Sequence, residues 1–585
     1  MGEITTLWPY HSRGLVEIAP AKMVSCRSVV SRLPMSVMST LPDPVSTVRD
    51  GLIGADRMLA TPFGTKPFLY ADYTASGRAL RQIERQVEAL MLDYANPHSE
   101  DSATGRASNR WMKDAEAVIR KAVNAGPDDC LLACAAGATG AIHKLQEILG
   151  LAVAPASRDA LGVEPGPAVR TVVFVGPYEH HSNELSWRDS LAEVVSIPLD
   201  SIGGIDLPAL DAALSNPRFD GWRKIGAFSA ASNVTGVRTD IASLAHCLHA
   251  HGAILCLDCA ASAPYQRIDM HPGHDPDGAI DAVYFSPHKF LGGPGACGIL
   301  VFNARLYRRD LAPTQSAGGT VRYVWQDGHD FLEGIEARER AGTPGLPQLV
   351  RAALAMQLQS EIGPDVIAER EHSALERAFQ RWCQHPRIDV LGPHSPARRL
   401  GIVSFNLRKV DGDPVEPRLV TLLLNDLFGI QSRAGCSCAG PYGHHLLGID
   451  DDTTQSIRAR ILEGDVGARP GWCRVSLHWV MSDEEIGYLI DAVCFLADHA
   501  ELFAGFYDRD ARTGAWRWAG DPVESEAPWP RRLLGSVLAD ADMPVSRCDG
   551  HDADRYETSF RAARDLVHVF RDSDLHPRDV QMLES

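Results

Sequence analysis

Short apolar runs alternate with longer amphipathic stretches through the first half of the chain. Each run is rich in aliphatic residues and has the length of a strand that is buried on both faces of a parallel sheet. The stretches between them, such as Asp240–His251, have helical spacing. This alternation predicts an α/β domain with a mainly parallel central sheet. The expected strands are Cys130–Ala133, Thr171–Val175, Ile225–Ser229, Ala253–Leu257, Ala282–Phe285 and Gly298–Phe302.

A second region follows the segment Gly342–Pro347, which is rich in glycine and proline. Helical spacing over Leu349–Ile362 is followed by alternating patterns that predict strands at Gly401–Leu407 and Cys473–His478. A further helix, Ser482–Leu496, is expected to begin with a capping box. The mixture predicts a smaller C-terminal α+β domain.

The length of 585 residues exceeds that of one ordinary domain. We expect a poorly packed extension over residues 1–45 and a large domain over 46–345, which opens with a helical segment (Val45–Leu59) and a strand near Phe68–Ala71. A small domain is expected over 346–505. No role can be assigned to a tail over 506–585.

The charge balance narrows the function. With Lys+Arg 57 and Asp+Glu 75 the formal net charge is −18, which argues against a nucleic-acid partner and favours small-molecule chemistry. The chain has no run of about 18 apolar residues that could span a membrane, and its first residues do not form a secretory signal. Its 13 scattered cysteines suit reduced thiols. These features predict a cytoplasmic protein without a membrane segment.

The segment Tyr284–Gly295 places a lysine directly after an expected strand. Lys289 lies between Pro287-His288 and Phe290-Leu291, so its surroundings are partly apolar. Desolvation lowers the pKa of a lysine and makes its amine a nucleophile for an aldehyde. The glycines that follow allow close approach to a cofactor. The alternative is a surface lysine in a turn.

Two other segments add candidate contacts to such a cofactor. Asp258 ends an expected strand, where its carboxylate could pair with a pyridinium nitrogen or could cap a following helix. Gly137–Gly140 leads into the helical stretch Ala141–Leu149, and N–H groups at a helix N-terminus hold phosphate. The Thr139 hydroxyl would add a donor.

The order of these motifs along roughly residues 65–500 resembles the class V aminotransferase group of fold-type I pyridoxal-phosphate (PLP) enzymes. The matching motifs are Gly137-Ala138-Thr139, Glu179-His180-His181-Ser182-Asn183, Ser232-Asn233, Asp258 and Ser286-x-His288-Lys289. The resemblance implies that PLP is bound to Lys289 as a Schiff base, that His180 stacks on the pyridine ring and that Asn233 contacts the phenolic oxygen. The cofactor-binding residues that it implies are Ala138, Thr139, His180, Asn233, Asp258, Ser286, His288, Lys289 and Thr343.

The resemblance also implies a homodimer in which Gly319-Thr320 or Gly342-Thr343 reaches the phosphate of the partner subunit.

Two departures from the family pattern remove polar contacts near the oxygen of the cofactor. Cys259–Ser262 has no glutamine after Asp258, and Ala230-Ala231 has no histidine before Ser232.

A segment of the second region, Arg433–Pro441, looks like the active-site loop of cysteine desulfurases and selenocysteine lyases. By this resemblance Arg433 holds the carboxylate of an amino-acid substrate through a bidentate pair. Cys438 takes the sulfur of L-cysteine as a persulfide and leaves alanine, and a sulfur-acceptor protein is a possible partner. Lys289 acts as acid and base at Cα, with His180 as a possible proton relay.

The main alternative keeps PLP but makes Cys436 and Cys438 inert. The chain would then be a class V aminotransferase, a lyase or an epimerase for another amino acid. A metal site at these cysteines with His444 and His445 matches no zinc pattern well, so no metal is expected. A binding or scaffold protein would usually have lost Lys289 or Asp258.

Overall fold

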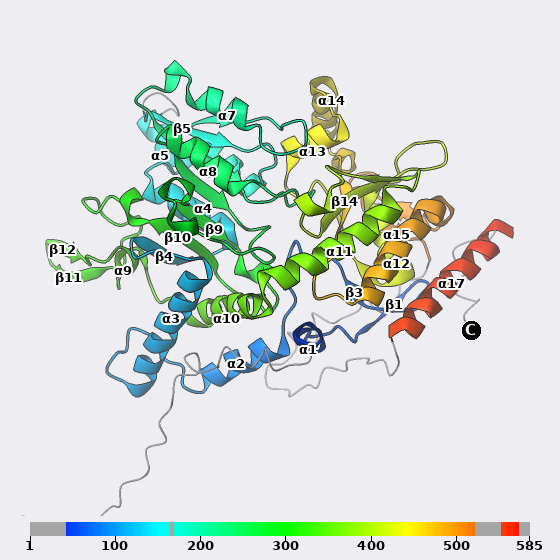
Figure 1. Cartoon of the computed structure of the whole chain (residues 1–585), viewed down its shortest axis with the longest axis horizontal. Helices are drawn as coiled ribbons and strands as arrows, with labels where there is room; N and C mark the ends of the chain where they lie inside the picture. The colour runs from blue at the N-terminus through cyan, green and yellow to red at the C-terminus, as the bar shows by residue number, and fades with distance from the viewer. Residues whose placement is uncertain (1–42, 164–168, 521–551, 573–585) are drawn as a thin grey trace, which may run out of the picture.

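The computed structural model describes residues 43–163, 169–520 and 552–572 (Figure 1). A seven-stranded sheet with the order β4-β10-β9-β8-β7-β5-β6 forms its centre. Strand β10 is antiparallel to both of its neighbours, and the other pairs are parallel. Every expected strand of the first region is present. The strands are β4 (Asp129–Cys134), β5 (Thr171–Val175), β6 (Glu193–Ser196), β7 (Arg223–Ser229), β8 (Ile254–Asp258), β9 (Ala282–Phe285) and β10 (Gly298–Asn303).

Both faces of this sheet are buried. On β5, Val172 and Phe174 belong to one apolar cluster, which α3 (Ala103–Ala122) and α8 (Ile241–Ala250) also enter. Val173 and Val175 belong to a second cluster, which α4 (Gly137–Ile148) enters. Full burial of an aliphatic side chain contributes about 1.5–3 kcal/mol, so helices on both faces favour continuous rather than alternating apolar runs.

The second region contains an antiparallel sheet with the order β13-β14-β17-β16. The predicted capping box is present at the N-terminus of α15, because Ser482 and Glu485 exchange side-chain to backbone hydrogen bonds of 3.1 and 2.7 Å. The predicted strand Cys473–His478 was too long by its last two residues. The elements are β13 (Ile388–Val390), β14 (Ile402–Leu407), β16 (Arg433–Gly435), β17 (Trp472–Ser476), α10 (Leu346–Ile362), α11 (Pro364–Trp382), α12 (Pro417–Phe428), α13 (Gly440–Leu447), α14 (Asp451–Leu462) and α15 (Asp483–Ala504).

The predicted helix Val45–Leu59 was wrong in its second half. Helix α1 (Pro44–Asp50) ends early, and β1 (Met58–Thr61) pairs with β2 (Gly64–Pro67). Strand β3 (Leu69–Tyr70) then pairs with β15 (Ile430–Gln431), so this segment joins the second region. The expected extension lies almost wholly outside the described residues.

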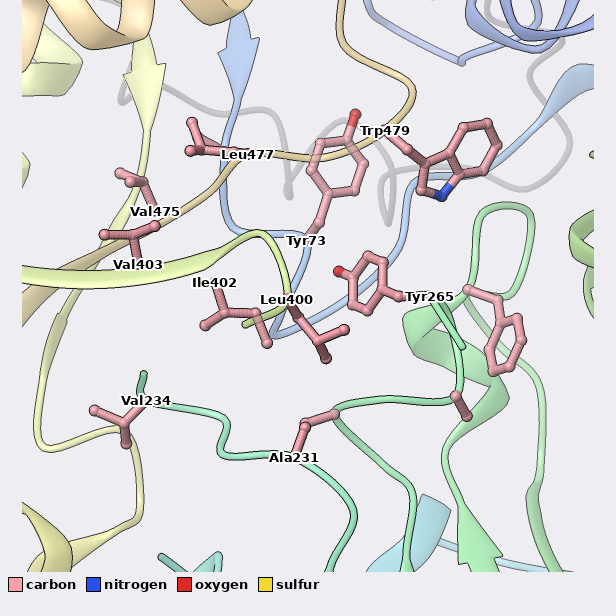
Figure 2. Close-up of a cluster of buried hydrophobic side chains, with 14 of the residues drawn as sticks. Tyr73, Ala231, Val234, Tyr265, Leu400, Ile402, Val403, Val475, Leu477 and Trp479 are labelled. Atoms are coloured by element: carbon pink, nitrogen blue, oxygen red, sulfur yellow. The ribbon is translucent and has the colours of Figure 1, made fainter. Parts of the chain in front are cut away.

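The two regions share a buried core, which Figure 2 shows in close-up. Tyr73 follows β3, Tyr265 follows β8, and Leu400 and Trp479 come from the second region; all four are buried. The second sheet therefore packs beside the segments that follow the parallel strands β7 and β8.

Part of the expected tail packs on the second region (Figure 1). Helix α17 (Asp552–Asp572) contacts α15 and α12, and Tyr556 stacks on Tyr488 with ring centroids 4.1 Å apart. A hairpin of β18 (Tyr507–Arg509) and β19 (Trp516–Trp518) follows α15 in the chain. The expected domain boundaries stay predictions.

The remaining elements lie around the large sheet or project from it. No helix within the described ranges has the length and apolar character needed to cross a membrane. The elements around the large sheet are α2 (Arg81–Met91), α5 (Pro155–Leu161), α6 (Leu185–Arg188), α7 (Leu207–Leu214), α9 (Ile335–Glu339), β11 (Val321–Trp325) and β12 (Gly328–Phe331).

Candidate active site

A pocket lies at the carboxyl ends of β7, β8 and β9, where α/β sheets usually bind ligands. Most of the residues that the sequence singled out for a cofactor line this one pocket. Those residues are Ala138, Thr139, His180, Asn233, Asp258, Ser286, His288 and Lys289.

Lys289 lies on the short 3₁₀ turn that follows β9 and is partly exposed to the pocket. Burial lowers its pKa to about 8; the negative charge of Asp258 opposes this shift, and the positive charge of Arg474 adds to it. About a tenth of the amine is therefore neutral at pH 7, far more than for an ordinary lysine, and the neutral form is the one that acts as a nucleophile or a base.

Asp258 ends β8 with 5% of its surface exposed. Burial raises its pKa, while the Ala260 N–H, which donates to Oδ1 at 2.8 Å, and the Lys289 ammonium favour the charged form. The alternative of a helix cap is wrong, because turns rather than a helix follow this residue.

Glycines bring the N-terminus of α4 close to the lysine segment. Gly137 has φ of 62°, and a Cβ there would lie 2.7 Å from Ser286 Oγ. A Cβ on Gly298 would lie 2.1 Å from the Gly137 carbonyl oxygen. The Ala138 N–H donates to Ser286 Oγ at 2.8 Å. The arrangement leaves a narrow cradle of N–H and hydroxyl groups that suits a phosphate.

His180 and Asn233 complete the polar part of the pocket. Burial lowers the pKa of His180 to about 3, so its ring is neutral, and its Nδ1 accepts from the Ser182 N–H at 3.1 Å. Asn233 Nδ2 donates to the Ser437 carbonyl at 2.7 Å. Asn233 Oδ1 is buried without a hydrogen-bond partner among the described residues. Leaving such an atom unpaired costs about 1–3 kcal/mol, which a polar ligand would offset.

These groups fit PLP. The Lys289 amine would hold the aldehyde carbon, and Asp258 would pair with the pyridine nitrogen. The cradle at Ala138, Thr139, Ser286 and His288 would hold the phosphate. Ala231 and Ala261 also line the pocket, so the departures from the family pattern place apolar groups at its wall.

Three predicted site residues do not line this pocket. Arg433, in β16, and Thr343 are exposed, and Thr343 Oγ1 accepts from Asn96 Nδ2 at 3.2 Å. Cys438 is partly buried on the turn before α13. That turn is attached to the pocket through the contact between Asn233 and Ser437.

Arg474 was not among the predicted site residues; it lies opposite Arg433 in the register of β16 and β17. Arg474 is 3% exposed and donates to the Asn233 carbonyl and to Asp72 Oδ1, each at 3.0 Å. Its Nε has no hydrogen-bond partner among the described residues. A charged residue inside a mainly apolar strand was the signal that could have identified it.

Glu179 was quoted as part of a motif but was given no role. It is buried, which raises its pKa to about 8. It accepts hydrogen bonds from the Ser229 N–H (2.8 Å), from Ser229 Oγ (2.6 Å) and from Asn183 Nδ2 (2.7 Å). This network anchors the segment that carries His180 to the end of β7.

Comparison with known proteins agrees with this geometry. The family model for aminotransferase class-V matches residues 69–489. A protein of Halalkalibacterium halodurans named "Probable cysteine desulfurase" is 27% identical over 398 residues, which cover 67% of this chain and 88% of that protein. A protein of Pyrococcus abyssi with the same name is 27% identical over 378 residues, which cover 64% and 86%.

Solved structures show the same fold. A cysteine desulfurase from Thermococcus onnurineus NA1 superposes with a TM-score of 0.61 at 21% identity and covers 77% of this chain and 98% of its own. One from Escherichia coli has a TM-score of 0.57 at 21% identity and covers 79% and 99%. Fold and pocket define a fold-type I enzyme that depends on PLP. The chain belongs to the class-V aminotransferase family.

The pKa of Lys289 predicts the pH dependence of cofactor uptake by the apoprotein. Only the neutral amine attacks an aldehyde, so below about pH 8 the rate of uptake should rise about tenfold per pH unit. Above about pH 8 the rate should level off. The measurement is the growth of visible absorbance after apoprotein and PLP are mixed between pH 6.5 and 9.5. A rate that keeps rising about tenfold per pH unit up to pH 9.5 contradicts a lowered pKa at Lys289.

Proposed function

We propose that the enzyme is a cysteine desulfurase, which converts L-cysteine to alanine and leaves the sulfur as a persulfide on Cys438. The observation that carries this proposal is the 2.7 Å hydrogen bond that attaches the Cys438 turn to Asn233 of the cofactor pocket. It brings a cysteine-bearing loop of the second region to the site of PLP chemistry. The names of the curated relatives support the same activity.

Two arginines supply positive charge for the carboxylate of the substrate. Arg474 is buried with a free Nε, and Arg433 lies across from it on the neighbouring strand. Asp72 partly neutralises Arg474 through its 3.0 Å ion pair. We assign the carboxylate to this arginine pair, with Arg433 moving inward when substrate binds.

Lys289 and His180 are the groups that move protons. PLP, when bound, withdraws electrons from the Cα of the substrate. The neutral Lys289 amine takes the Cα proton and returns a proton later in the reaction. His180 is neutral and can pass protons at its Nε2, because its Nδ1 is engaged by the Ser182 N–H.

Transfer of sulfur from the substrate to Cys438 needs no outside oxidant. The Cys438 thiolate attacks the sulfur of the substrate, so that an S–S bond forms and the bond between Cβ and sulfur breaks. The electron pair of that bond goes to the substrate carbon, which gains a proton and becomes the methyl group of alanine. The thiol is thereby oxidised to a persulfide. A reducing thiol then releases sulfide and regenerates Cys438.

A product assay tests the activity. With L-cysteine and a reducing thiol, the holoenzyme should release alanine and sulfide in a 1:1 ratio over many turnovers. Alanine is measured by amino-acid analysis and sulfide by a colorimetric assay, with L-serine as the control because it has no sulfur. Release of neither product from a PLP-loaded enzyme contradicts the proposal. Amino-donor and keto-acid panels would then test the aminotransferase alternative.

The remaining expectations belong to the same proposal. We infer a cytoplasmic homodimer in which the exposed Thr343 reaches the phosphate site of the partner subunit, since Thr343 lies outside the pocket of its own chain. A sulfur-acceptor protein would take the persulfide sulfur from Cys438, which is partly exposed.

A further inference from the structure

The turn that carries Cys438 has an unfavourable backbone. Ser437 and Cys438 have φ of 51° and 57°, so two consecutive residues with side chains adopt the left-handed conformation. Each costs about 1–2 kcal/mol in that region. Such a turn persists only where its surroundings hold it in place.

Three hydrogen bonds join this turn to loops of the large sheet. Asn233 Nδ2 donates to the Ser437 carbonyl at 2.7 Å. The His181 N–H donates to the Cys438 carbonyl at 2.8 Å. The Gly440 N–H donates to His181 Nε2 at 2.9 Å. His181 therefore contacts the reactive cysteine itself and the residue two positions after it, and Asn233 contacts the residue before it.

The imidazole of His181 also acts as a helix cap. Helix α13 begins at Gly440, and its N-cap residue, Ala439, has no side chain that can accept a hydrogen bond. His181 pairs with one of the N–H groups that a helix N-terminus leaves without an intrahelical partner. Burial lowers the pKa of His181, so the ring is neutral and its Nε2 can accept. A Cβ on Gly440 would lie 3.2 Å from Nε2, so the glycine allows this close approach.

We propose that His181 is a positioning residue that latches the Cys438 turn onto the cofactor pocket. Its neighbour His180 lines that pocket, so one short segment contacts both the cofactor site and the sulfur-accepting turn. Loss of the imidazole acceptor should loosen the turn, place the thiol less well for sulfur transfer and expose it more often to solvent. The link to sulfur transfer rests on the proposed desulfurase activity; the link to thiol exposure does not.

Two substitutions at His181 separate the acceptor from the bulk of the side chain. His181→Leu keeps much of the volume and removes the acceptor. His181→Gln restores an acceptor, because its Oε1 is as many bonds from Cα as Nε2 is. Asn places its oxygen one bond shorter, so His181→Asn is a polar variant that should behave like His181→Leu and replaces it if the leucine variant does not fold.

The first measurement is the rate at which iodoacetamide alkylates Cys438 in the holoenzyme, followed by mass spectrometry of the Cys438 peptide. We expect His181→Leu to react about tenfold faster than wild type, the size of effect that one net hydrogen bond gives. The second measurement is kcat for alanine formation, which should fall about tenfold. His181→Gln should return both values to within about threefold of wild type, and the visible cofactor spectrum should not change in any variant.

The outcomes separate the latch from the activity. If no variant and no wild type forms alanine, but His181→Leu raises alkylation and His181→Gln restores it, the latch stands and the desulfurase proposal fails. If wild type forms alanine and His181→Leu alkylates and turns over like wild type, the latch is wrong. Equal acceleration in the leucine and glutamine variants also overturns it, because the acceptor atom then has no part in holding the turn.

Discussion

Replacing Lys289 with alanine is expected to lower kcat for any amino-acid substrate by about a thousand-fold or more. The pocket offers no other amine: Lys289 alone among the lysines of the described residues lines it. The substitution removes both the nucleophile for the cofactor aldehyde and the base at Cα. Borohydride reduction should link the cofactor covalently to wild type and not to the variant, as the mass of the intact chain would show.

Two variants control this result. Lys289→Arg keeps the positive charge but cannot become a neutral amine, so it should lose activity as fully as the alanine variant. Lys113→Ala removes an exposed lysine of α3 and should leave kcat within about twofold of wild type. More than a tenth of the wild-type kcat in Lys289→Ala, or covalent cofactor in it after reduction, would show that the reactive lysine is elsewhere.

Much of the large sheet could be predicted because the burial of each strand shows in its own residues. A strand covered by helices on both faces must be apolar at nearly every position, and Thr171–Val175 and Ala282–Phe285 match β5 and β9 residue for residue. The pocket was also predictable. In a mainly parallel sheet the residues that end successive strands meet at one edge, which brings Asp258 and the Lys289 segment together.

What the sequence could not show depends on pairings between distant segments. Met58–Thr61 has apolar residues that also suit a helix, and its pairing with β2 decides that it is a strand. Arg474 is tolerated in a buried strand because Asp72, 402 residues away in the chain, neutralises it. The acceptor for the Gly440 N–H comes from His181, 259 residues away. No periodicity within a short window carries that information.

Replacing Cys438 with serine is expected to lower alanine formation from L-cysteine by roughly a thousand-fold or more and to leave the cofactor spectrum unchanged. Serine has nearly the same size, so the left-handed turn and its hydrogen bonds to His181 and Asn233 should persist. A hydroxyl at neutral pH is a far weaker nucleophile than a thiol, so it should not take the sulfur. Steps before sulfur transfer, including binding of L-cysteine seen as a spectral change, should continue.

Cys436→Ser is the matched control, because Cys436 lies on the same loop two residues earlier and is also partly buried. It should keep kcat within about twofold of wild type and should still give a persulfide, detected as an added mass of one sulfur on the Cys438 peptide. If both serine variants form alanine at the wild-type rate, neither cysteine accepts sulfur. The Cys438 turn would then shape the pocket for another amino acid, as in the aminotransferase, lyase or epimerase alternative. Loss of turnover in Cys436→Ser alone would move the sulfur acceptor two residues along this loop and would remove the reason for latching the turn at Cys438.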